Sequence, residues 1–343
     1  MVNTVPAKYM GGAGQIQFAR APAMPILYSA RELVNNPFSV EGRRGRNSMP
    51  AKRIFWVGTG VMGAPMAGHL LAAGHSVSVH TRTRARAADL EATGVAWVES
   101  PAEGAAEADV VCTMVGYPAD VESAVLGRDG VLGGMCAGSC LIDFTTSSPE
   151  LARRIASEGA HRDVGCLDAP VSGGDVGARN ASLSIMVGGE AEVFEAARPL
   201  LETVGKTIVY QGPAGAGQHT KMVNQVLIAT TMIGVCEGLL YAQRAGLNPE
   251  TVLKSVGSGA AMSWSLANLA PRILKGDLAP GFYVEHFVKD MSIALAECER
   301  MGLTLPGLEL AHRLYCKLVE LGMEQNGTQA LIRALEKMND RDR

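Results

Sequence analysis

Residues 53–63 read Arg53-Ile-Phe-Trp-Val57-Gly58-Thr-Gly60-Val-Met-Gly63, a short apolar strand that runs directly into a glycine-rich turn. A helix-like stretch over residues 64–73 follows and ends at Gly74. In this setting the first glycine permits the tight turn, the second lets the backbone approach a pyrophosphate, and the third lets helix and strand pack closely. The helix N-terminus, with its unpaired N–H groups and dipole, favours an anion. We therefore predict a dinucleotide site formed by Gly58, Thr59, Gly60, Val61, Met62 and Gly63.

Strand-like and helix-like segments alternate beyond this motif. We expect a helix near residues 101–107 and further strands at residues 76–80, 95–98, 110–115, 140–144, 166–168, 183–187 and 206–210. Strands that alternate with helices imply a mostly parallel sheet with helices on both faces. The predicted class is α/β, with an N-terminal Rossmann, doubly wound parallel sheet over residues 51–212 that binds NADP.

The pattern changes after about residue 212, where the apolar spacing becomes helical and proline or glycine separates most segments. We expect helices near residues 218–244, 249–258, 263–275, 284–301, 306–322 and 328–338. They predict an all-helical C-terminal domain over residues 213–343 for substrate binding and dimerisation. The first helix is apolar on nearly every side, and such a helix must be covered all round. We predict that it lies between the domains, with a second subunit as further cover.

Length and composition exclude several classes of protein. The 343 residues suggest about two domains, and a hydrophobic share of 47% is enough for a sizeable core. Charged residues make up 19% and the net charge is −3, which argues against binding nucleic acid or an anionic membrane by bulk electrostatics. No run of 18 apolar residues is free of Gly, Thr or charge, so we predict no membrane span.

The cysteines and the N-terminal segment bear on location. The seven cysteines are odd in number and dispersed, which we interpret as reduced thiols of an intracellular protein and not as a metal site. We therefore expect a cytoplasmic protein. Residues 1–50 lack periodicity, contain Arg43-Arg44-Gly45-Arg46, and have no apolar segment typical of a secretory signal. They are a disordered extension or a targeting peptide, and the second alternative would place the protein in a mitochondrion or another organelle.

The end of the second predicted strand bears on the choice between NAD and NADP. An acidic residue there would bond the ribose hydroxyls. This chain instead has Thr81, Arg82 and Thr83 after His80, with no carboxylate. Arg82 is suited to pair with a 2′-phosphate. We predict NADP, with NAD as the alternative. If these residues do not bind a cofactor, they are a solvated basic helix start.

Lys221 opens the long apolar segment, in Gly215-Ala-Gly-Gln-His-Thr-Lys221-Met-Val-Asn224. Burial disfavours an ammonium, so we expect a lowered pKa that lets the amine give and take a proton near neutral pH. The alternative is a lysine whose stem is buried and whose amine reaches solvent. Upstream, Ser172, Gly173 and Gly174 follow a strand and expose backbone N–H groups beside a hydroxyl, a suitable cradle for a carboxylate.

In this order the three motifs resemble those of the β-hydroxyacid dehydrogenase family. Its members include 3-hydroxyisobutyrate dehydrogenase, tartronate semialdehyde reductase and the glyoxylate/succinic semialdehyde reductases. The resemblance covers residues 52–336, and Lys289-Asp290-Met291 resembles the family's Lys-Asp-Leu. Other segments are most similar to the 3-hydroxyisobutyrate dehydrogenase-like branch, which includes organellar plant proteins: Gly116-Tyr-Pro118, Gly281-Phe-Tyr-Val-Glu-His-Phe287, Leu305-Pro-Gly307 and Gly327-Thr-Gln-Ala330.

The resemblance implies a role for each matching residue. Lys221 would donate and accept the proton, and Asn224 would orient it or the substrate. Ser172, Gly173 and Gly174 would hold the substrate carboxylate. Lys289 would lie near nicotinamide and substrate, and the cofactor would also be lined by Val115 and Thr146.

Some positions depart from the family pattern. Gln225 stands where many members have a second Asn, and Ala181-Ser182 replaces a usual Gly-Thr. Gly327 and Gln329 replace the common Asp and Ser of the C-terminal motif, so the resemblance does not identify the substrate. Trp264 and His286 are candidates for the substrate pocket, although core packing is the preferred interpretation of Trp264.

The resulting hypothesis is an NADP-preferring enzyme that interconverts a small 3-hydroxy acid and its semialdehyde, as a homodimer or homotetramer. The alternative is an NADPH-dependent glyoxylate/succinic or tartronate semialdehyde reductase. An imine reductase of the same fold typically carries another residue at the lysine position, and a non-catalytic nicotinamide-binding module loses that lysine. A 6-phosphogluconate-type enzyme would need a longer helical domain and a phosphate-binding cluster.

Overall fold

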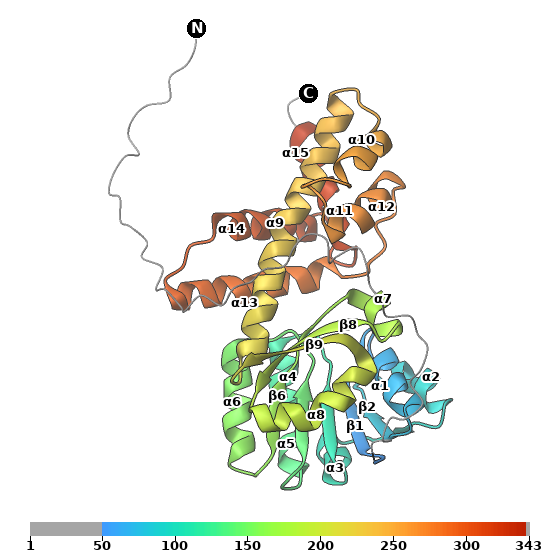
Figure 1. The fold of residues 1–343 in the computed structure, drawn as a ribbon, viewed down its shortest axis with the longest axis vertical. Coiled ribbons are helices and arrows are strands. Elements are labelled where there is room, and N and C mark those ends of the chain that lie inside the picture. The colour runs from blue at the N-terminus through green and yellow to red at the C-terminus, as the bar shows by residue number, and fades with distance from the viewer. Residues whose placement is uncertain (1–49, 341–343) are drawn as a thin grey trace, which may run out of the picture. The chain divides into compact units, whose positions relative to one another are not determined.

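The computed structural model describes residues 50–340 (Figure 1). The extension predicted over residues 1–50 lies outside the described residues except for Pro50, so both interpretations of it stay predictions. The last strand ends at Gly212 and only helices follow it in the described chain. The domain boundary after residue 212 nevertheless stays a prediction.

A mostly parallel sheet forms the first part of the described chain. Its strand order is β3-β2-β1-β4-β5-β6-β8-β7, with β9 also paired to β8. Only the pairs β6–β8 and β7–β8 are antiparallel. The strands are β1 (Arg53–Val57), β2 (Ser76–His80), β3 (Ala96–Trp97), β4 (Val110–Thr113), β5 (Cys140–Asp143), β6 (Gly165–Asp168), β7 (Val171–Ser172), β8 (Leu183–Gly189) and β9 (Gly205–Gly212). The order reverses between β1 and β4, and ligands of open α/β sheets bind beside the carboxyl ends at such a point.

Helices cover both faces of this sheet. They are α1 (Gly63–Ala72), α2 (Ala88–Glu91), α3 (Pro101–Ala106), α4 (Pro118–Leu126), α5 (Val131–Gly134), α6 (Pro149–Ala160), α7 (Gly174–Arg179) and α8 (Ala191–Val204), with the 3-10 helix η1 (Arg84–Ala87). An apolar core lies on each face of the sheet. Alternate residues of β1 belong to different cores, because successive residues of a strand point to opposite faces. Ile54 and Trp56 pack with residues of α1 and α8, whereas Phe55 and Val57 pack with residues of α3, α4, α5 and α6.

The C-terminal part consists of helices packed around a third core. They are α9 (Ala216–Arg244), α10 (Pro249–Val256), α11 (Trp264–Asn268), α12 (Ala270–Leu274), α13 (Val284–Met301), α14 (Pro306–Glu320), η2 (Thr328–Ala330) and α15 (Leu331–Asp340). The core contains Met222 and Met232 of α9, Phe287 of α13 and Tyr315 of α14. The rings of Phe287 and Tyr315 meet edge to face at 4.9 Å. The predicted sequence of a Rossmann sheet followed by helices is therefore confirmed.

The boundaries show where the sequence pattern was accurate. The strands at residues 53–57 and 76–80 have the predicted limits. The helix expected over residues 263–275 is instead two helices, α11 and α12, which meet at Leu269. Pro271 lies in the first turn of α12, where a missing N–H is tolerated, whereas in a continuous helix it would remove an internal hydrogen bond. Strand β4 ends two residues earlier than predicted.

Helix α9 is not covered all round by its own chain. One face packs into the C-terminal core, but Val223 is 60% exposed, Leu227 62% and Tyr241 75%. The cover of α9 is therefore incomplete within the described residues of one chain, and the expected cover by a second subunit stays a prediction. By length and composition α9 alone among the described helices could cross a membrane. Core helices meet the same criteria, so absence of a membrane span stays a prediction.

The packing of α3 on β1 gives a test of the sheet core. A Cβ on Gly104 would lie 2.2 Å from the fully buried Phe55 ring, so Gly104→Ala should destabilise the protein by about 1–3 kcal/mol through overpacking. Gly133→Ala in α5 is the control, because a Cβ there meets nothing within 4 Å. It should be neutral or slightly stabilising. Urea unfolding of both variants measures the difference, and equal stabilities would contradict this packing.

Candidate active site

The glycine-rich turn after β1 has three glycines in different surroundings. Gly58 has φ +100°, and its N–H donates to the carbonyl of His80 at 2.8 Å. A Cβ on Gly58 would lie 2.2 Å from the Met114 carbonyl oxygen, and one on Gly63 would lie 2.0 Å from the Gly58 carbonyl oxygen. A Cβ on Gly60 meets nothing within 4 Å. A side chain at position 58 or 63 would thus collide with the protein's own backbone. Gly60 instead leaves open space in front of the backbone.

That open space lies at the start of α1. Met62 is the N-cap of α1 and makes no side-chain cap hydrogen bond. Ala64 N donates to the Gly60 carbonyl at 3.0 Å and Pro65 has no N–H, so Gly63 supplies the N–H that the first turn leaves for an anion. Val61 is exposed, and Thr59 is buried with a hydroxyl that has no hydrogen-bond partner. Val115 follows β4 and lies beside Gly58, where its Cγ1 would be 3.2 Å from an added Cβ. These residues fit a dinucleotide pyrophosphate at the β1–α1 turn.

Arg82 follows the carboxyl end of β2 and is 83% exposed at its side chain. Its Nη1 lies 3.0 Å from Asp120 in the first turn of α4. Arg84 is engaged elsewhere, since it pairs with Glu91 at 2.9 Å and lies over the Trp97 ring at 4.7 Å. Arg82 and Arg86 are both exposed after this strand end, and Arg82 lies between a buried Thr81 and an exposed Thr83.

Lys221 is buried at 7% exposure and lies in the second turn of α9. Its Nζ donates to the carbonyl of Val171 at 2.8 Å. Burial lowers the pKa of this amine from 10.5 to about 8, while the Asp290 carboxylate raises the pKa and the Lys289 ammonium lowers it. The predicted desolvation is confirmed, and the alternative of an amine that reaches solvent is wrong. An amine with this pKa holds or releases a proton close to neutral pH.

A chain of hydrogen-bonded polar side chains begins at Asn224, one turn after Lys221, and runs from α9 to α13. Asn224 does not bond Lys221, but its Nδ2 donates to Gln225 Oε1 at 2.6 Å. Gln225 Nε2 donates to Asp290 Oδ2 at 2.6 Å, and Asp290 Oδ1 lies 2.9 Å from Lys289 Nζ as an ion pair without hydrogen-bond geometry. The chain therefore fixes the orientation of the Asn224 amide through Gln225.

Lys289 connects this chain to the loops of the sheet. Its Nζ donates to the carbonyls of Thr146 at 2.7 Å and Gly116 at 3.2 Å. Both carbonyls lie just after strand ends, beyond β5 and β4. Lys289 thus contacts the backbone of Thr146 beside the loop that contains Val115. These three residues were expected to line the cofactor, and their roles in binding it stay predictions.

The Ser172–Gly174 turn lies directly beside the lysine. Val171, whose carbonyl binds the amine, immediately precedes Ser172. Gly173 has φ +129° and Gly174 φ +60°, conformations that L side chains rarely adopt. Gly174 begins α7, and a Cβ there would lie 3.5 Å from the Gly281 carbonyl oxygen of the C-terminal part. The turn therefore brings a hydroxyl and free N–H groups close to a proton-carrying amine.

Two residues that hold the start of α9 were not assigned this role from the sequence. Asp168 accepts from the N–H groups of Gly215 and Gln218, each at 2.8 Å. The fully buried Gln218 side chain accepts from Ser147 N at 2.9 Å and donates to the Thr145 carbonyl at 2.8 Å. A polar Gln in the first turn of an apolar helix was the available signal for this contact.

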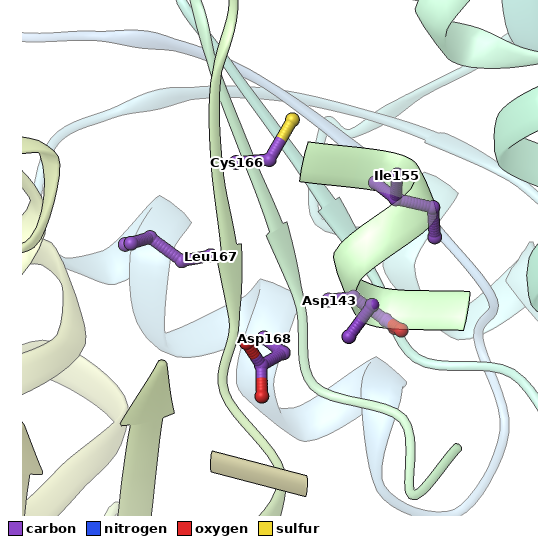
Figure 2. Close-up of a pocket in the computed structure, with 6 residues that line it drawn as sticks. Asp143, Ile155, Cys166, Leu167 and Asp168 are labelled. Atoms are coloured by element: carbon purple, nitrogen blue, oxygen red, sulfur yellow. The ribbon is translucent and has the colours of Figure 1, made fainter. Parts of the chain in front are cut away.

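The carboxylates of Asp143 and Asp168 line a small cavity of about 10 Å³ at the carboxyl ends of β5 and β6 (Figure 2). Burial raises the pKa of Asp168 to about 6, against hydrogen bonds from Gly215 and Gln218 that lower it. Burial also raises the pKa of Asp143, against hydrogen bonds from Thr113 and Thr145. The cavity has the volume of roughly one water molecule and does not hold a substrate.

Three further residues were assigned incompletely from the sequence. Trp264 is 65% exposed, so the core-packing interpretation is wrong. It is the first residue of α11, a five-residue helix that buries only Ser265. Gln329 is buried and donates to the carbonyls of Asp277 and Ala279, which makes it a brace of that loop. His286 is half-buried and lies against the rings of Tyr117 and Tyr283.

Within residues 50–340, no group of three or more His, Cys, Asp or Glu side chains is arranged to hold a metal ion. The seven cysteines are unpaired. Cys112 and Cys166 are buried in the sheet and Cys140 is partly buried, and burial raises the pKa of each thiol. These thiols are therefore protonated near neutral pH.

Two family models together match most of the chain. The NAD-binding domain of 6-phosphogluconate dehydrogenase matches residues 53–212, and the NAD-binding domain of NADP-dependent 3-hydroxyisobutyrate dehydrogenase matches residues 215–335. An Arabidopsis thaliana protein named probable 3-hydroxyisobutyrate dehydrogenase-like 1, mitochondrial, is 47% identical over 84% of this chain and 86% of its own. The 2-hydroxy-3-oxopropionate reductase of Escherichia coli is 35% identical over 83% of this chain and 98% of its own.

Among solved structures, the 3-hydroxyisobutyrate dehydrogenase of Mycobacterium tuberculosis with L-serine has the same fold. Its TM-score is 0.77 at 31% identity, and the match covers 83% of this chain and 99% of the other. Cofactor use is therefore NAD(P), as the glycine-rich turn indicates.

The buried amine should make stability depend on pH. The unfolded chain keeps the Lys221 proton up to about pH 10.5 and the folded chain only up to about pH 8, so this residue lets stability rise with pH between those values. Below this window the desolvated charge costs about 3 kcal/mol. Lys221→Met removes this cost. The free energy of unfolding of the variant minus that of the wild type should therefore be more positive at pH 7 than at pH 10.

Urea unfolding at both pH values measures this difference. Lys206→Met is the control, because Lys206 is exposed and its replacement should shift stability little at either pH. A Lys221→Met effect that is the same at pH 7 and pH 10 would show that the amine is not desolvated.

Proposed function

The chain belongs to the β-hydroxyacid dehydrogenase family, and we propose that it interconverts a small 3-hydroxy acid and its semialdehyde with Lys221 as general acid and base. It is an NAD(P)-dependent oxidoreductase of the CH–OH group. The observation that carries the proposal is the buried Lys221 amine on the Val171 carbonyl, one residue before the Ser172–Gly174 turn. Because the amine binds the residue that precedes this turn, a small substrate with its carboxylate close to its hydroxyl would reach both.

The chemistry follows from this arrangement. The bound nicotinamide supplies hydride to the aldehyde carbon or accepts it from the alcohol carbon. Lys221 in its charged form protonates the alkoxide oxygen during reduction, and in its neutral form takes the hydroxyl proton during oxidation. Ser172 and the N–H groups of Gly173 and Gly174 hold the substrate carboxylate, which fixes the reacting oxygen near Nζ.

The polar chain supports this role for Lys221. Burial lowers the pKa of the amine to about 8, while Asp290 is close enough to raise this pKa and Lys289 is close enough to lower it. Asn224, held by Gln225, is placed one turn after Lys221, where its free amide atoms can reach the substrate oxygen or Nζ. Removing water from this site strengthens each of these electrostatic effects.

The finer identity of the substrate is open between members of the family. A reductase of 2-hydroxy-3-oxopropionate (tartronate semialdehyde), glyoxylate or succinic semialdehyde is the alternative, and one relative carries the first of these activities in its name. The retained Lys221 and cradle argue against an imine reductase and against a non-catalytic cofactor-binding module. Gln329 hydrogen-bonds the carbonyls of Asp277 and Ala279 and stands where the family pattern commonly has Ser, so that pattern does not identify the substrate.

We further propose NADP as the preferred cofactor. Arg82 is exposed beyond β2 with no carboxylate of its own strand end nearby, and a 2′-phosphate could replace Asp120 as its partner. The exposed apolar residues of α9 support the proposal of a homodimer or homotetramer. A cytoplasmic location stays our expectation, and the mitochondrial name of the Arabidopsis relative supports the organellar alternative.

Turnover with a panel of substrates tests the function. NADPH oxidation should proceed with at least one of tartronate, succinic and methylmalonate semialdehyde or glyoxylate, and NADP reduction should proceed with 3-hydroxyisobutyrate or L-serine.

Lys221→Ala should reduce kcat by about 100-fold or more, because it removes the proton donor, while the Kd for NADPH stays nearly unchanged. Near-full turnover in Lys221→Ala would refute the assignment.

The direction of the reaction should set the direction of the pH dependence. Because oxidation needs the neutral amine and reduction the charged one, kcat/KM for oxidation should rise through about pH 8 and kcat/KM for reduction should fall through the same pH. Initial rates from pH 6 to 10 in both directions measure this. Parallel profiles in the two directions would contradict a single shared acid and base.

Arg82→Ala tests the cofactor preference. Loss of a charge-assisted contact should raise the Kd for NADPH about tenfold or more and leave the Kd for NADH within about twofold. Isothermal titration of both cofactors measures the ratio. Arg84→Ala is the control, because Arg84 is paired with Glu91. Equal loss of both cofactors in Arg82→Ala would indicate a structural role instead.

A further inference from the structure

We propose that Asp168 is a positioning residue that fixes Lys221 relative to the carboxylate-binding turn. Asp168 ends β6, and its side chain is buried beneath the first turn of α9. The proposal rests on the proposed function of Lys221 and adds a residue that touches neither substrate nor cofactor. It acts through the position of α9.

The carboxylate occupies the place of a helix cap. Gly215 is the N-cap of α9 and has no side chain, so the first N–H groups of the helix need another acceptor. Asp168 Oδ1 accepts from Gly215 N and Oδ2 from Gln218 N, each at 2.8 Å. Negative charge at a helix N-terminus is also favoured by the helix dipole. Since the two oxygens bind different residues of the turn, α9 cannot rotate or slide without breaking at least one bond.

Two glycines from distant parts of the chain make room for this carboxylate. A Cβ on Gly188 of β8 would lie 2.5 Å from Asp168 Oδ1, and a Cβ on Gly217 of α9 would lie 2.8 Å from Oδ2. The Gly217 position is also only 2.4 Å from the Met186 carbonyl oxygen. The helix start therefore lies directly on the ends of β6 and β8, at a distance that only glycine permits.

The same segment of chain holds the amine and the substrate turn. Val171, three residues after Asp168, binds Lys221 Nζ through its carbonyl at 2.8 Å, and Ser172 follows. Lys221 lies three residues after Gln218 in α9. Asp168 thus ties the backbone of α9 to the segment that carries the cradle. A displacement of about 1 Å between a catalytic group and its substrate can lower the rate about 100-fold.

Asp143 shows that burial alone does not give this role. It lines the same cavity as Asp168 and is its partner in the β5–β6 register (Figure 2). Its Oδ1 accepts from Thr113 Oγ1 at 2.7 Å and from Thr145 N at 3.0 Å, within the sheet and its loops. Of the two carboxylates, only Asp168 has hydrogen bonds to the helix that carries Lys221.

Asp168→Asn in the full chain tests the proposal. The amide keeps one acceptor and turns an N–H toward a backbone N–H, so the helix start should shift. We expect kcat to fall about 10–100-fold while the Kd for NADPH changes less than about threefold. An unchanged kcat would overturn the proposal.

A double-mutant cycle with Lys221→Ala separates positioning from a general structural effect. If Asp168 acts through Lys221, Asp168→Asn should cause no further loss in the residual turnover of Lys221→Ala. The same fold-loss in both backgrounds would overturn the proposal and leave the proposed function intact. Full turnover in Lys221→Ala alone would overturn the function, and with it this role of Asp168.

Two further variants distinguish a shift of the helix start from a loss of charge and from a loss of stability. Gly188→Ala retains every charge, but its Cβ would lie 2.5 Å from Asp168 Oδ1 and 2.7 Å from Gly217 N, so it displaces the start of α9 and should reproduce the loss of kcat and its non-additivity with Lys221→Ala. Asp109→Asn is the matched control, because Asp109 also accepts a backbone N–H, from Arg53 at 2.8 Å, at the opposite end of the sheet. It should lower Tm without lowering kcat. A loss of kcat in Asp109→Asn equal to that in Asp168→Asn would overturn the proposal.

Discussion

The bond between the Asp168 carboxylate and the start of α9 is the constraint on which the arrangement of the site depends. A carboxylate buried without partners would be costly, and here the two N–H groups of Gly215 and Gln218 satisfy it. Neither group would have an intrahelical partner otherwise. The same contact therefore satisfies both the buried carboxylate and the N–H groups at the helix start. It also joins the sheet to the helix that carries Lys221.

The environment of Lys221 combines burial with partial compensation. A fully desolvated ammonium would be unstable, and a fully paired one would keep its proton too firmly to release it near neutral pH. The Val171 carbonyl offers one acceptor to Nζ, and Asp290 acts from a greater distance while it pairs directly with Lys289. The resulting pKa of about 8 reflects burial more than any single charge. Below about pH 8, folding stability is thus reduced at the residue that we propose as the general acid and base.

The sequence predicted the elements with a strong local signal. The strand at residues 53–57 and its glycine turn follow from apolar residues and from glycines whose Cβ atoms would collide with nearby backbone. Lys221 was predicted to be desolvated because it opens an apolar segment, and it is buried. In contrast, Trp264 was expected in a core and is exposed, because nothing local to α11 shows that so short a helix has little to pack against.

By itself the sequence determined the alternation of strands and helices up to residue 212, the helical pattern beyond it, the glycine turn and the residue types of the site, because these depend on periodicity and on local backbone conformation. The tertiary structure decided which groups meet. Asp168 and Gly215 are 47 residues apart in the chain, and Lys221 and Val171 are 50 apart. Gln225 and Asp290 are separated by 65 residues. Such contacts depend on strand register and on the close approach of α9 to β6 and β8, which no local pattern encodes.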